Sequence, residues 1–169
     1  MIPCDILFDE IVTEPYYLKV LSKNPEILKK IENPQKFGVT FEKIVSEMFR
    51  RAGKKATPTP YHDNGVDIIV DTEFEKSPMR FLVQCKIRKN KNISKKDIEA
   101  FFYKVNMDPQ WTNHTKAIFV TNSKYSKSAI SFASKYSNRL EIWDPDKLSD
   151  ILRGLFSPSN TFGRQNKKT

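Results

Sequence analysis

The sequence predicts an α/β fold with a central mixed sheet flanked by helices. Three observations predict it: an amphipathic helical pattern over residues 40–52, two short strand-like segments after it, and an alternation of strands with helices beyond residue 93. Strands that alternate with helices are typical of parallel pairing, whereas consecutive strands joined by a short turn pair antiparallel. The sheet is therefore expected to contain both kinds of pairing.

The helical pattern is clearest over residues 40–52. Its apolar side chains begin at Phe41 and recur at the i, i+3, i+4, i+7 spacing that forms one buried stripe. Thr40 is expected to cap the start of this helix and Gly53 its end. Glu42 lies one step round from Phe41, at the edge of the stripe rather than on the far face.

Two strands are expected next, at residues 65–71 and 79–87, because their β-branched and aromatic content favours strands and they are too short for helices. Turn signals precede the first at Asn64 and Gly65 and separate the two at 76–78. An edge strand is expected within residues 54–62, although two prolines weaken it. A helix capped by Ser94 and Asp97 is expected after the two strands. Further strands are expected at 116–122 and 140–143, and further helices at 126–137 and from Pro145.

Three parts of the chain differ in character. Residues 1–37 are cut by prolines into short helical pieces and are interpreted as an N-terminal helical arm, with a dimerisation element as the open alternative. Residues 38–156 form the main domain. Residues 157–169 are polar and basic and are expected to form a flexible tail.

Composition narrows the function classes. The chain has 169 residues, 38% of them hydrophobic, which is too many for a disordered protein. No apolar stretch approaches the roughly 20 residues that span a bilayer, so no membrane partner is expected. Only two cysteines are present and the first ten residues carry no Lys or Arg, so we expect an intracellular, reducing compartment such as cytoplasm or nucleus. A net charge of +9 favours a polyanionic partner, although charge alone does not establish one.

Polar residues on the two expected strands form the candidate site. Side chains alternate along a strand, so Gln84 and Lys86 project from one face and Cys85 from the other. A lysine and a glutamine on an otherwise apolar strand need polar partners, because an unpaired buried charge is costly. If the strands pair as a hairpin, Asp67 meets them at one end of the sheet, and Glu42 supplies a second carboxylate.

These groups have the chemistry of a metal-dependent phosphodiesterase. Mg²⁺ (or Mn²⁺) prefers oxygen ligands, usually one or two carboxylates with waters and phosphate. Asp67 would be the principal ligand, with Glu42, the Gln84 amide oxygen and the main-chain carbonyl of Cys85 as further ligands. Lys86 would stabilise developing negative charge or position the attacking water.

The same residues also have plain structural interpretations. Gln84 and Lys86 fit the solvated face of an edge strand, Asp67 fits a turn residue, and Glu42 fits an acid favoured by a helix N-terminus. Cys85 is expected to point into the core as a small hydrophobe. Residue types alone leave both interpretations open.

Three motifs resemble the PD-(D/E)xK nuclease superfamily: Glu42 in an amphipathic helix, D-x-G-x-D at residues 63–67, and Q-x-K at residues 84–86. This form is similar to the Mrr-like restriction endonuclease branch, and the resemblance covers about residues 38–152. It implies a restriction-endonuclease-like αβββαβ core, Mg²⁺-dependent cleavage of DNA, and the roles assigned above. Gln84 stands where many members have an acid, and an amide contributes only a dipole to metal binding.

The expected protein is therefore a Mg²⁺-dependent endodeoxyribonuclease acting on duplex or branched DNA. The alternative is a non-catalytic nucleic-acid-binding module on the same fold. A homodimer is plausible, because cutting both strands of a duplex needs two sites, but no residue proves it.

Two runs of basic residues flank the expected site. A charged run is usually a solvated loop, but here the runs adjoin a site that needs phosphate contacts. The residues predicted to bind nucleic acid are Arg50, Arg51, Lys54, Lys55, Arg88, Lys89, Lys91, Lys95 and Lys96.

Overall fold

The computed structural model describes residues 15–30, 33–59, 65–109 and 111–157. The ends of the chain, including all of the expected tail after residue 157, lie outside the described residues. The helices are α2 (Pro15–Lys23), α3 (Glu26–Lys29), α4 (Pro34–Arg51), α5 (Lys95–Asn106), α6 (Lys127–Lys135) and α7 (Pro145–Leu155). The strands are β1 (Lys55–Pro58), β2 (Ile68–Phe74), β3 (Ser77–Lys86), β4 (Thr115–Thr121) and β5 (Leu140–Trp143).

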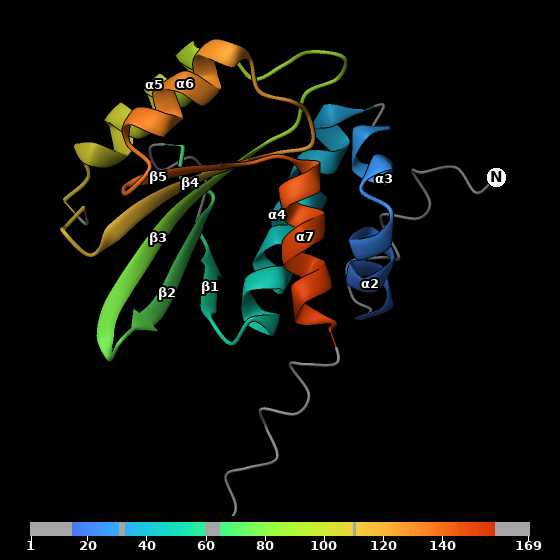
Figure 1. Cartoon of the computed structure of the whole chain (residues 1–169), viewed down its shortest axis with the longest axis horizontal. Coiled ribbons are helices and arrows are strands. Elements are labelled where there is room, and N and C mark those ends of the chain that lie inside the picture. The colour runs from blue at the N-terminus through green and yellow to red at the C-terminus, as the bar shows by residue number, and fades with distance from the viewer. Residues whose placement is uncertain (1–14, 31–32, 60–64, 110, 158–169) are drawn as a thin grey trace, which may run out of the picture.

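One five-stranded sheet, in the order β1-β2-β3-β4-β5, forms the centre of the fold. β1, β2 and β3 pair antiparallel, whereas β3, β4 and β5 pair parallel. Helices α4 and α7 cover one face of the sheet, and α5 and α6 cover the other (Figure 1). The predicted α/β class and mixed pairing are confirmed, and the order α4-β1-β2-β3-α5-β4 is the predicted αβββαβ.

The hairpin between β2 and β3 turns earlier than predicted. Glu75 and Lys76 have φ values of 48° and 66°, as in the two-residue turns whose twist matches that of paired strands. Pro78 therefore lies within β3, opposite Glu73, and not in the turn expected at 76–78.

Helix α4 is longer than the predicted helix. It begins at Pro34, a residue suited to the first helical position, so the prediction that Thr40 caps its start is wrong. The prediction for its end is confirmed. Gly53 has a φ of +80°, and the Lys54 amide donates to the Phe49 carbonyl at 3.0 Å, which is the Schellman pattern of a glycine-terminated helix.

The first two described helices pack into the main core. Leu18 and Leu21 of α2 are buried in the same cluster as side chains of α4 and α7. The Ser149 hydroxyl on α7 donates to the Ser22 carbonyl at 2.8 Å, which fixes α2 against α7. The boundary expected between residues 37 and 38 falls inside α4.

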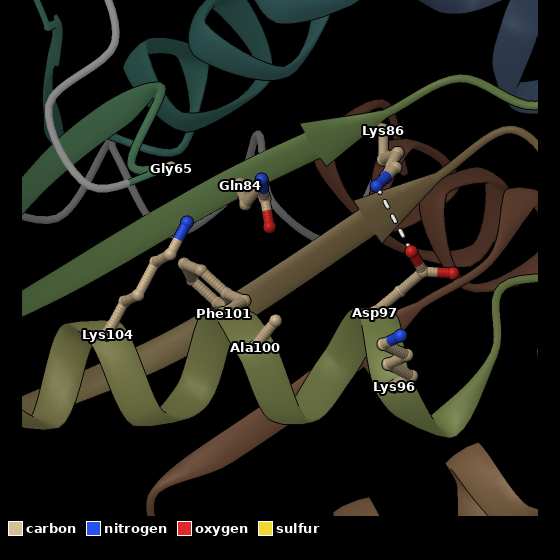
Figure 2. Close-up of a pocket in the computed structure, with 8 residues that line it drawn as sticks. All are labelled: Gly65, Gln84, Lys86, Lys96, Asp97, Ala100, Phe101 and Lys104. Atoms are coloured by element: carbon tan, nitrogen blue, oxygen red, sulfur yellow. Dashed lines mark hydrogen bonds and ion pairs between the residues drawn. The ribbon is translucent and has the colours of Figure 1, made fainter.

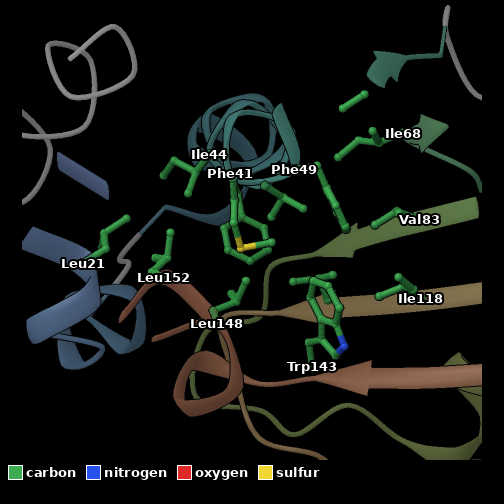
Figure 3. Close-up of a cluster of buried hydrophobic side chains, with 14 of the residues drawn as sticks. Leu21, Phe41, Ile44, Phe49, Ile68, Val83, Ile118, Trp143, Leu148 and Leu152 are labelled. Atoms are coloured by element: carbon green, nitrogen blue, oxygen red, sulfur yellow. The ribbon is translucent and has the colours of Figure 1, made fainter. Parts of the chain in front are cut away.

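Each face of the sheet has its own hydrophobic core. The α4–α7 core contains Phe41, Phe49 and Trp143, and the rings of Phe49 and Trp143 stack at 5.6 Å (Figure 3). The core under α5 and α6 contains Leu82 and Phe119. Burying each large apolar side chain contributes roughly 1.5–3 kcal/mol, so both faces hold the sheet rigidly.

β3 divides its side chains between these two cores. Phe81, Val83 and Cys85 pack on the α4–α7 side, and Leu82 packs on the α5–α6 side. Strand alternation therefore places Gln84 on the α5–α6 side, together with Lys86. Cys85 faces the core as predicted.

The strand expected at residues 65–71 begins only at Ile68, because the chain turns at Gly65 and β2 leaves β3 at Asp67, whereas the predicted cap of α5 is confirmed. Ser94 and Asp97 form a capping box at the start of α5, Ser126 caps α6, and Asp144 caps α7 ahead of Pro145. Within the described part of the chain, no helix is long and apolar enough to cross a membrane.

Candidate active site

β2 and β3 separate at Asp67. The Asp67 amide donates to the Val83 carbonyl at 2.8 Å, although Ile68 is the residue that pairs with Val83. Asp67 and Ile68 thus both lie opposite Val83, as two residues lie opposite one in a β-bulge. Val66 accordingly packs under α5 and α6 while Ile68 packs on the α4–α7 side, so the alternation is broken between them. We call this separation the β2–β3 fork.

The Asp67 carboxylate closes this fork. Its Oδ2 accepts a hydrogen bond of 2.7 Å from the Cys85 amide, where a regular ladder would supply a β2 carbonyl. The bond fixes the carboxylate beside the stretch of β3 that carries Gln84 and Lys86. Asp67 is therefore a strand-end residue with a directed side chain, and it is more than a turn residue.

Gly65 makes room for Gln84 at the same place. Its φ of +76° is rarely adopted by other residues, and a Cβ atom there would lie 3.2 Å from Gln84 Nε2. Glycine thus serves both the turn into β2 and the close approach of the amide. His62, Asp63 and Asn64 lie outside the described residues.

Glu42 reaches the fork from α4. It is half-buried, and burial together with the nearby Asp67 charge raises the pKa of Glu42 to about 7. Burial, Asp67 and Glu42 also raise the pKa of the Cys85 thiol, so this thiol stays protonated and is a poor nucleophile. Two carboxylates therefore share one poorly solvated corner, which a bound cation would stabilise.

Gln84 and Lys86 line a cavity of about 240 Å³ between β3 and α5 (Figure 2). Lys86 Nζ lies 3.1 Å from Asp97 Oδ1, and an Arg88 guanidinium nitrogen lies 3.0 Å from the same oxygen. Burial would raise the pKa of Asp97, but hydrogen bonds from Ser94 and Lys86 outweigh it and hold the pKa below its usual range. Asp97 is thus an ionised anchor for Lys86.

The end of β4 fixes the backbone around Lys86. The Thr121 hydroxyl donates to the Lys86 carbonyl at 2.7 Å. The Asn122 side chain accepts from the Arg88 amide at 2.8 Å and donates to the Arg88 carbonyl at 3.0 Å. This stretch of backbone is therefore held in place beyond the last residue of β3.

Sequence reasoning identified Asp97 only as a capping residue and missed its contact with Lys86. The available signal was that Asp97 is the first acid after six basic residues that begin at Lys86. In the described ranges, no group of three or more His, Cys, Asp or Glu side chains is arranged to hold a metal ion. The carboxylates at the fork are Glu42 and Asp67.

Many of the basic residues predicted to bind nucleic acid have partners within the protein. Arg50 donates to the Ala56 carbonyl, Lys54 to the Thr72 hydroxyl, and three others pair with carboxylates. The paired carboxylates are Glu47 for Arg51, Asp97 for Arg88 and Glu99 for Lys95. Five of the nine predicted residues thus have partners within the protein, whereas the side chains of Lys55, Lys89, Lys91 and Lys96 have no such partner among the described residues.

The sequence that forms the fork and the cavity matches the model of one protein family. The family model for restriction endonucleases of the Mrr type matches residues 37–152. The chain belongs to the Mrr restriction endonuclease family. It is a restriction endonuclease-like nuclease domain, and the predicted PD-(D/E)xK resemblance is confirmed. No curated protein sequence matches the chain significantly.

Solved structures of restriction enzymes share the fold. FokI bound to DNA superimposes with a TM-score of 0.57 and 13% identity, over 96% of this chain and 32% of FokI. The DNA modification-dependent restriction endonuclease AspBHI gives a TM-score of 0.56 and 14% identity, over 89% of this chain and 38% of AspBHI. The Mrr domain thus spans about a third of the length of these enzymes, and at this identity the likeness shows the fold alone.

Proposed function

We propose that this Mrr domain is a Mg²⁺- or Mn²⁺-dependent endodeoxyribonuclease that hydrolyses phosphodiester bonds of DNA at the β2–β3 fork. The observation that carries the proposal is the 2.7 Å bond from the Cys85 amide to the Asp67 carboxylate. This bond holds an acid beside the strand segment that bears Gln84 and Lys86, and Glu42 adjoins the same acid.

The residues at the fork fit a hard divalent cation, and restriction endonucleases generally use a divalent metal. Asp67 and Glu42 are the carboxylate ligands in this proposal, and Gln84 and the Cys85 carbonyl add neutral oxygens. The raised pKa of Glu42 supports this assignment, because a cation relieves the repulsion that raises it. When bound, the metal would activate water and polarise the phosphate.

The protein side chains supply orientation and charge. The Cys85 amide fixes Asp67, so its carboxylate does not need to reorganise during the reaction. Asp97 holds the Lys86 ammonium at the cavity edge. A fixed positive charge there stabilises the negative charge that develops on the phosphate.

Plasmid cleavage with Mg²⁺, Mn²⁺ or chelator tests the proposal. We expect Asp67→Ala and Lys86→Ala each to lower cleavage by about 100-fold or more, the loss typical of removing one transition-state contact. Asp71→Ala and Lys116→Ala are matched controls, because each removes an ion-paired residue elsewhere in the sheet. Cleavage that survives in both site variants would reject the proposal.

The alternative, a non-catalytic DNA-binding module, is favoured by Gln84 itself. An amide in place of an acid leaves two carboxylates at the described fork and weakens cation binding. The two functions differ in one measurement: the binding module retards duplex DNA in gel shifts yet cleaves none with any divalent metal, whereas the nuclease does both.

A further inference from the structure

The cavity beside Lys86 carries more positive charge than the protein neutralises. Its lining includes three lysines, Lys86, Lys96 and Lys104, and one acid, Asp97. That acid is already bonded to Lys86 and Arg88. Within the ranges that the structure describes, the ammonium groups of Lys96 and Lys104 have neither an ion-pair partner nor a hydrogen-bond partner. The cavity is therefore suited to an anion.

The two lysines lie in one row along α5 because of the helical spacing between them. Lys96, Ala100 and Lys104 are spaced by four residues and lie along one side of α5. The small side chain of Ala100 leaves space between the two lysines, and Figure 2 shows Lys104 extending from α5 toward β3. Eight residues of helix separate the lysines by about 12 Å along the axis. One strand of B-DNA presents three to four phosphates over about that length.

We propose that Lys96 and Lys104 bind backbone phosphates of the DNA strand whose scissile phosphate lies at Lys86, so that this strand runs along α5. The inference rests on the proposed function and specifies it further. Phosphate is the favoured ligand because the lining offers several ammonium groups, next to the buried ring of Phe101. Contacts between ammonium groups and phosphates carry no sequence information, so the site should accept DNA of any sequence. Lys104 is a residue that the charge runs of the sequence did not single out.

A salt titration of DNA binding tests this inference without catalysis. A fluorescein-labelled 20-base-pair duplex of arbitrary sequence is titrated with the full chain in chelator, and log affinity is plotted against log salt. Each phosphate contact contributes about 0.9 to the slope, so Lys96→Ala with Lys104→Ala should lower it by about 1.8. Lys127→Ala with Lys135→Ala removes the same charge from α6 and should leave the slope nearly unchanged.

The outcomes separate this inference from the proposed nuclease activity. A slope reduced only in the α5 double variant supports the inference, whether or not the wild-type chain cleaves plasmid. Equal reductions in both double variants show a general charge effect and overturn it, as does an unchanged slope in the α5 variant. Absence of wild-type binding to the duplex at low salt also overturns it. Thermal melting of each variant confirms that the compared proteins are folded.

Discussion

Two groups of opposite charge adjoin the end of β3: the carboxylates at the fork, which we call the carboxylate side, and the lysines of the cavity, which we call the lysine side. Toward α4, Asp67 and Glu42 bring two carboxylates together in a corner that raises the pKa of Glu42. Toward α5, Lys86, Lys96 and Lys104 line a cavity whose one acid is already paired. In the proposed nuclease the two groups act on one phosphodiester, the carboxylates through the cation that they bind and Lys86 through its own charge.

The two sides also differ in how they are held. The carboxylate side depends on a backbone irregularity, the bulge at Asp67, and on one amide donor from Cys85. The lysine side depends on a side-chain network centred on Asp97, which caps α5 and binds two cations. Disturbing one side should therefore leave the other largely intact.

The largest effect is expected at the centre of the lysine side. Asp97→Asn keeps the shape of the side chain but removes the charge that binds Lys86 and Arg88 and weakens the capping box. Charge-assisted bonds contribute about 1.5–3 kcal/mol and a cap about 1 kcal/mol, so we expect a loss of about 2–3 kcal/mol in unfolding free energy. Urea denaturation measures it.

Asp150→Asn is the matched control for that variant. Asp150 pairs with Arg153 three residues later on α7, and both side chains are exposed. An exposed pair of this kind contributes about 0–1 kcal/mol, so this variant should lie near wild type. Equal losses in the two variants would contradict the role of Asp97 as an anchor.

The next effect tests the turn into the fork. Gly65→Ala places a Cβ atom 3.2 Å from Gln84 Nε2 at a φ of +76°, so we expect a loss of about 1–2 kcal/mol. Gly154→Ala in α7 is the control, because an added Cβ meets nothing within 4 Å there. Alanine is favoured over glycine within a helix by about 0.5–1 kcal/mol, and Gly154 lies in the last turn of α7, so we expect a gain of at most about that size. The two variants should therefore shift the thermal midpoint in opposite directions. A Gly65→Ala protein as stable as wild type would show that Gln84 is not closely packed.

Much of the fold could be predicted because local chemistry determines it. Ser94 and Asp97 cap α5 and Gly53 ends α4 through groups within a few residues of each other. The start of α4 could not be predicted in the same way. Phe37 is buried one turn before Phe41, so tertiary packing extends the helix through Gly38, a poor helix former.

The site was predictable to the extent that strand alternation determines it. Alternation placed Gln84 and Lys86 on one face and Cys85 on the other, as the structure has them. The bond from the Cys85 amide to Asp67 depends on a bulge that no residue pattern announces. The contact of Lys86 with Asp97 joins residues 11 positions apart on different elements, and only the packing of α5 against β3 produces it.

The smallest effect concerns the carboxylate side and its pH dependence. The pKa of Glu42 is raised from 4.5 to about 7 in the folded chain. Between these values the folded state holds a proton that the unfolded state has lost, so wild-type stability falls as the pH rises through this window. Glu42→Gln has no such proton to lose. The variant should therefore melt higher than wild type at pH 8, and the difference should vanish near pH 4.5.

Solvent reaches Glu42, so the gain at pH 8 should be about 1 kcal/mol or less, or about 2–4 °C in melting temperature. Glu47→Gln removes a carboxylate from the same helix that pairs with Arg51, so it relieves no repulsion and should not melt higher than wild type at pH 8. Adding Mg²⁺ at pH 8 should raise the melting temperature of wild type more than that of Glu42→Gln, because the cation relieves the same repulsion that the substitution removes. Equal Mg²⁺ shifts in the two proteins would mean that the pair at the fork does not hold the cation.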